Sequence, residues 1–60
     1  MKYEIITDDE FFELLASSKI HKHSELGFIG VFDVSVEING SIKEATLINS
    51  AESDKNVFIH

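Results

Sequence analysis

The pattern of apolar and polar positions is clearest between Phe28 and Ile48, where the two kinds of residue alternate along most of the segment. Alternation with a period of two is typical of a strand with one buried face. Asn39 and Gly40 interrupt the pattern, and this dipeptide favours the two-residue turn of a β-hairpin. We therefore predict a hairpin here, whose first strand has these residues on its core face: Phe28, Phe32, Val34, Val36 and Ile38.

A two-residue turn also determines the register of the hairpin, because the side chains of a strand alternate between its faces. On the core face the predicted pairs are Val34 with Ala45, Phe32 with Leu47, and Val36 with Lys43. On the reverse face they are Val31 with Ile48, Asp33 with Thr46, Ser35 with Glu44, and Glu37 with Ile42. A three-residue loop would oppose Val36 to Glu44 and Val34 to Thr46, which is a poorer match.

The pattern changes to a helical period after Thr7. Thr7 and Glu10 have the spacing of a capping box, and Ile6 and Phe11 have that of a hydrophobic staple. Acidic residues follow Thr7 directly, where the helix dipole favours negative charge. We predict a helix from about Asp8 to Ser18 with one broad apolar side, formed by Phe11, Phe12, Leu14, Leu15 and Ala16.

The remaining segments complete a small α+β domain. Lys2 to Ile6 is predicted to be a strand with Tyr3 and Ile5 on its core face, and Val57 to Ile59 a short last strand. The polar segments Lys19–Glu25 and Asn49–Asn56 are predicted to be loops. The expected fold is a mainly antiparallel sheet of three or four strands with one helix on one face, in the order β-α-β-β-β.

The chain has 60 residues, so residues 1–60 form one small domain whose stability is marginal. It has no cysteine, which excludes disulfides and fits a cytoplasmic protein. Neither a secretory signal nor a membrane-spanning run is indicated. One apolar core must therefore hold the fold, and we expect it to contain Tyr3, Ile5, Phe11, Phe12, Leu15, Phe28, Phe32, Val34, Val36, Ala45, Leu47 and Phe58.

The net charge is −6, with five lysines and no arginine. This composition disfavours direct binding to nucleic acids or anionic membranes, for which basic side chains supply the affinity. The acidity serves either solubility or the attraction of a basic partner.

Residues that could carry chemistry have simpler explanations. His21 and His23 have a spacing that could share a metal ion, but they lie beside a lysine in a predicted loop. The acids after Thr7 are explained by helix capping, and Ser17 and Ser18 lack the orienting acid that a Ser–His pair requires. We therefore predict no enzymatic activity, no catalytic residues, no cofactor and no metal site.

The reverse face of the hairpin is the strongest functional candidate. Ile29, Val31 and Ile48 cluster near its base, and one short helix can cover only one side of a sheet. These apolar residues are covered either by a predicted loop or by a partner. The candidate interface adds the outward acids of the sheet and helix, and its members are Ile29, Val31, Ile48, Asp33, Glu37, Glu44, Glu10 and Glu13.

The sequence thus favours a non-enzymatic, acidic protein-binding module. By analogy of size and charge with small proteins that phages encode, it would be an inhibitor, an antitoxin-like protein or an adaptor acting on a larger macromolecule. The alternative is a structural or assembly subunit that forms homo-oligomers through its sheet. A mimic of nucleic-acid charge is a more distant alternative.

Overall fold

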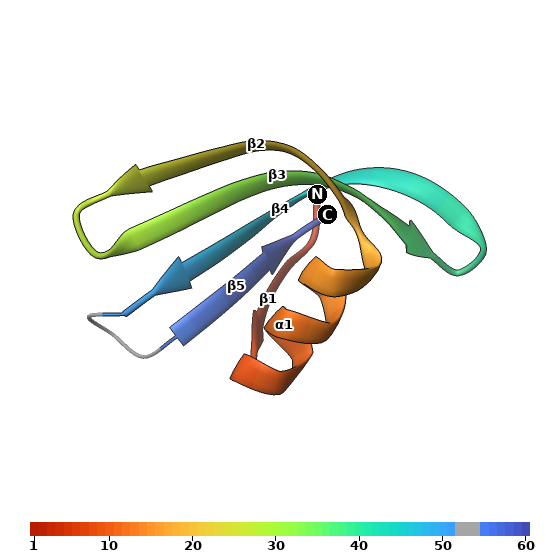
Figure 1. Ribbon diagram of the computed structural model, residues 1–60. Helices are drawn as coiled ribbons and strands as arrows, with labels where there is room; N and C mark the ends of the chain where they lie inside the picture. The colour runs from red at the N-terminus through yellow and green to blue at the C-terminus, as the bar shows by residue number, and fades with distance from the viewer. Residues whose placement is uncertain (52–54) are drawn as a thin grey trace.

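The computed structural model describes residues 1–51 and 55–60 and confirms the α+β class (Figure 1). One helix and five strands follow one another in the order β-α-β-β-β-β. Their bounds are β1 Tyr3–Ile6, α1 Asp8–Ser17, β2 Lys19–Leu26, β3 Ile29–Ile38, β4 Ser41–Ser50 and β5 Lys55–Ile59.

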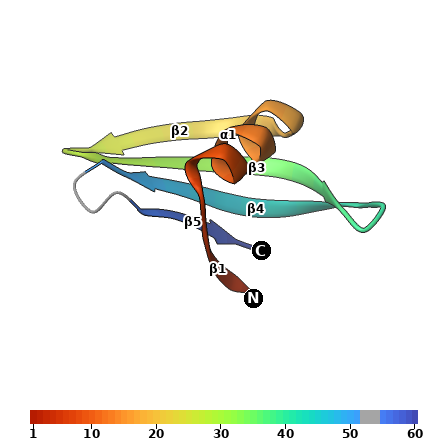
Figure 2. The same ribbon diagram turned by 90° about the horizontal axis from the view of Figure 1, so that it is seen from below.

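The five strands form one antiparallel sheet in the order β1-β5-β4-β3-β2. Strands β2 to β5 follow one another as a meander, and β1 lies on the far side of β5 (Figure 2). Lys2 and His60 extend this last pairing with two backbone hydrogen bonds, each 2.9 Å long. The sheet bends around the side on which α1 lies (Figure 1).

The central hairpin has the predicted register at every pair. Val34 lies opposite Ala45 and Phe32 opposite Leu47, while Val31 lies opposite Ile48 on the reverse face. Asn39 and Gly40 both have positive φ angles, 51° and 83°, as a type I′ turn requires.

The predicted start of the helix is also confirmed. The Thr7 hydroxyl accepts a hydrogen bond from the backbone N–H of Glu10, and the Glu10 carboxylate accepts one from the backbone N–H of Thr7, both at 3.2 Å. Ser18, predicted as the last helical residue, is the C-cap. Phe11 is buried, and Leu14 and Leu15 pack against the core.

The segment predicted as a loop over Lys19–Glu25 is instead most of the edge strand β2. It pairs with β3 along its length, with a bulge between Ile20 and Lys22. The segment was predicted to be a loop because its residues are mostly polar. An edge strand can be polar, since little of it is buried. The predicted Asn49–Asn56 loop is also shorter than expected, since β4 continues to Ser50 and β5 begins at Lys55; residues 52–54 of it lie outside the described residues.

Half of the predicted core is buried, and it lies between α1 and the centre of the sheet. The buried apolar residues are Phe11, Val34, Val36, Ala45, Leu47 and Phe58. Phe32 and Leu15 pack against them while partly exposed.

Tyr3 and Ile5 were predicted in the core, but both side chains are exposed. Ile6, at the staple position, packs against the core on the helix side. Because side chains alternate along a strand, Tyr3 and Ile5 must then face the other way.

Phe12 and Phe28 are also exposed rather than buried, at 60% and 71%. Phe12 follows the buried Phe11 and lies about 100° further around the helix, which takes it off the core. Phe28 precedes β3 in the two-residue turn that joins Leu26 to Ile29. The alternation of side chains along a strand therefore does not determine which way the Phe28 side chain points.

Candidate functional site

The side of the sheet opposite α1, which we call the open face, carries several exposed apolar residues. A row of four residues crosses four strands in register: Ile5 lies beside Val57, Val57 beside Ile48, and Ile48 beside Val31. Ile5 is 64% exposed, and the other three are half-buried. Within residues 1–51 and 55–60, α1 is the sole helix, and it packs on the opposite side.

Further apolar residues surround this row. Tyr3 and Ile59 pair on one side of it, and Leu26 and Ile29 pair near the β2–β3 turn. Of the predicted apolar interface, Ile29, Val31 and Ile48 therefore do share one surface, and Ile5 and Val57 extend it. The sequence pattern missed both, because it placed Ile5 in the core and assigned Val57 no face.

The open face also carries charged residues of both signs. Its acids are Asp33, Glu37 and Glu44, and its lysines, by register, are Lys19, Lys22 and Lys55. Asp33 accepts a hydrogen bond from Thr46 at 3.3 Å, and Glu44 accepts one from Ser35 at 3.0 Å. The acids predicted to draw a basic partner to this face are thus balanced by lysines on the same face.

The other two predicted interface acids, Glu10 and Glu13, lie on the opposite side of the molecule. They line a surface hollow with Glu4 and Leu14, so the structure does not join them to the open face. All the described acids outside the open face lie on this helix side: Glu4, Asp8, Asp9, Glu10, Glu13 and Glu25. Lys2 and Lys43 are the lysines there, so the described acidic excess is concentrated on the helix side.

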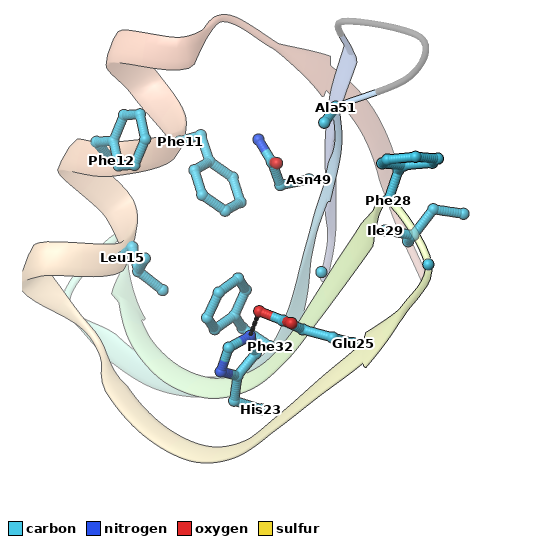
Figure 3. A pocket seen from close by; sticks show the side chains of 12 residues that line it. Phe11, Phe12, Leu15, His23, Glu25, Phe28, Ile29, Phe32, Asn49 and Ala51 are labelled. Carbon is cyan, nitrogen blue, oxygen red and sulfur yellow. Dashed lines mark ion pairs between the residues drawn. The ribbon is translucent and has the colours of Figure 1, made fainter.

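A second surface is a hollow of about 390 Å³ between α1 and the β2–β3 turn, which we call the aromatic groove (Figure 3). Phe11, Phe12 and Leu15 of α1 form one wall. Phe28 and Ile29 lie on the opposite side, and Phe32 lies at the base (Figure 3). Its polar lining side chains are His23, Glu25 and Asn49.

Several of the rings that line the aromatic groove contact one another. His23 stacks on Phe32 with ring centres 4.2 Å apart and planes 8° apart. Phe11 meets Phe32 edge to face at 5.9 Å and Phe12 at 5.4 Å. The His23 Nε2 lies 3.5 Å from the Glu25 Oε1 (Figure 3).

The two histidines whose spacing could share a metal ion lie on opposite faces of the sheet. The bulge in β2 sends His21 to the open face, where its Nε2 hydrogen-bonds the Ser35 hydroxyl, while His23 points to the helix side. Among the described residues, no group of three or more histidine or acidic side chains is arranged to hold a metal ion. Ser17 and Ser18 each donate a hydroxyl hydrogen bond to a helix carbonyl.

Comparison with known proteins gives no assignment. No family model matches the chain, and neither a curated protein nor a solved structure is significantly similar to it. In the part of the chain that the structure describes, no helix has the length and apolarity to cross a bilayer. The open face and the aromatic groove are therefore the features from which a function can be inferred.

Proposed function

We propose that the protein is a non-enzymatic protein-binding module whose contact surface is the open face. The observation that carries this proposal is the apolar row from Ile5 to Val31, continued by Tyr3, Ile59, Leu26 and Ile29. A cluster of exposed and half-buried apolar residues on one face is typical of an interaction site, especially when polar residues rim it. The inhibitor, antitoxin-like and adaptor roles all use such a surface against a larger target.

The same surface supports the alternative of a homo-oligomeric assembly subunit. Self-association through the sheet edges is less favourable, because the β2 edge carries Lys19 and Lys22 and a bulge, and β1 has only four residues. Lysines, bulges and short edge strands all oppose strand-to-strand addition. A second copy would therefore also use the open face.

Ile5→Glu tests the open face, with Ile42→Glu as the matched control. Both residues are isoleucines on this face and are similarly exposed, at 64% and 71%, but Ile42 lies near the tip of the β3–β4 hairpin, away from the row. Mass in solution and capture of partners from a host lysate are measured for each variant. We expect Ile5→Glu to keep its melting temperature and to lose its partner, or to fall to the 6.8 kDa monomer mass. If Ile5→Glu retains both mass and partner, the proposal fails.

A second candidate function is recognition of a basic partner by the helix side. The acidic excess around Glu4, Glu10 and Glu13 favours this side over the open face. Glu13 reversed to lysine should weaken such binding and reduce its salt dependence more than the same reversal of Glu37, whereas Glu10 also caps the helix and is left unchanged. Competition by DNA would identify the target as a nucleic-acid-binding protein and the mechanism as charge mimicry. Affinity that is independent of ionic strength would exclude this second function.

A further inference from the structure

We infer that the aromatic groove is a binding site for an arginine side chain of a partner protein. The groove lies on the helix side of the sheet, and Ile29 at the β2–β3 turn is the open-face residue that also lines it. The inference rests on the volume of the groove, on the rings that line it and on the position of one carboxylate.

The volume and the lining of the groove are compatible with a ligand site. Its volume of about 390 Å³ lies in the range of ligand pockets, and its lining is mostly apolar with few polar groups. Phe12 and Phe28 stand on opposite sides and are 60% and 71% exposed. An occupant of the groove would cover the exposed parts of both rings.

The polar group best placed to select the occupant is the Glu25 carboxylate. His23 contacts its Oε1 at 3.5 Å, which leaves Oε2 able to accept hydrogen bonds from a ligand. Glu25 is the acidic residue that lines the groove, and its negative charge favours a cation as the occupant.

Arginine matches this combination better than the other cationic side chains. Its planar guanidinium stacks on aromatic rings and also pairs with a carboxylate through two N–H donors. A lysine ammonium is a compact, strongly hydrated charge that cannot make this two-point pairing. Its apolar stem and flat head thus let arginine contact the phenylalanines and Glu25 together.

The experiment uses Nα-acetyl-arginine N-methylamide as the probe. The citrulline and lysine analogues serve as matched probes, because citrulline replaces the guanidinium by a neutral group of nearly the same shape. Each is titrated into the isotopically labelled protein and followed by NMR. We expect saturable shifts at His23, Glu25, Phe28 and Phe32, with the citrulline analogue binding about tenfold more weakly.

Two protein variants separate the carboxylate from general charge effects. Glu25→Gln should lower arginine affinity about tenfold, to the level of the citrulline probe. Glu37→Gln removes the same charge on the open face and should leave the affinity unchanged; the spectra of both free variants verify the fold. Equal binding of arginine and citrulline, equal or tighter binding of lysine, shifts centred on the open face, or no saturable shift would each overturn the inference.

Discussion

Asn56 donates a hydrogen bond from its carboxamide nitrogen to the carboxylate of Asp8, across 48 positions of the chain. The Asn56 oxygen accepts a second hydrogen bond from the amide of Asn49. Asn56 is only 2% exposed, so these two bonds satisfy a buried polar side chain. They tie the first turn of α1 to β5 and β4, and so place Phe11 over the core.

Asn56→Ala should destabilise the protein by about 1–3 kcal/mol, because it leaves the half-buried amide of Asn49 without its acceptor. Chemical denaturation measures the change. Asn49→Ala is the partner variant, and the double variant should lose less than the sum of the two single changes. Full additivity would show that the two amides act independently.

Thr7→Ala should cost about 1 kcal/mol, because it removes the oxygen that accepts the Glu10 N–H. In a domain of this size, that loss lowers the melting temperature by about 4–8 °C. Glu13→Ala, on the same helix and without a capping contact, should change stability by less than about 0.5 kcal/mol. An unchanged melting curve for Thr7→Ala would contradict the capping role.

Gly40→Ala should destabilise the central hairpin through the backbone alone. The φ angle is 83°, and a Cβ atom at this position would meet nothing within 4 Å. An L-alanine there costs about 1 kcal/mol or more, whereas D-alanine adopts a positive φ freely. Synthetic chains with L- and D-alanine at position 40 form a matched pair, and equal melting temperatures would exclude this explanation.

Leu47→Ala should cost about 2–5 kcal/mol, because Leu47 is fully buried at the centre of the core. A 60-residue domain has a total stability of only a few kcal/mol, so this variant should be largely unfolded at room temperature. Ile42→Ala, at an exposed position of the same strand, should remain folded. Far-UV circular dichroism distinguishes the two outcomes.

Local signals predicted the fold well where one turn or one cap determines the geometry. Asn39-Gly40 determines the pairing of Val34 with Ala45, and Thr7 with Glu10 determines where α1 begins. These features depend on residues that are neighbours in sequence or separated by a tight turn, so the pattern contains the information.

The errors arose where tertiary contacts decide. His23 is a polar residue in sequence, yet it packs as a flat ring on Phe32, which no periodicity of apolar residues reveals. The bulge after Ile20 breaks the alternation of β2 as well. In β1, Ile5 and Ile6 are successive residues, so their side chains point to opposite faces of the sheet. Because Ile6 occupies the staple position and faces the helix, Ile5 could not have been a core residue.

The aromatic groove could not be predicted because it is assembled from three distant segments. Phe12, Phe28 and Glu25 were interpreted separately as core or loop residues, and only the packing of α1 beside the β2–β3 turn brings them to one hollow. The open face was partly predicted, from Val31 and Ile48, since the hairpin register determines that pair.

The position of β1 beside β5 has a consequence for the order of events during synthesis. Among the described elements, β1 leaves the ribosome first, whereas β5, the described strand that pairs with it, is made last. The meander of β2, β3 and β4 joins segments close in sequence and can form while synthesis continues. Tyr3 and Ile5 must therefore remain in an unpaired segment until β5 emerges, and the hydrogen bonds between Lys2 and His60 form only after both segments have been translated.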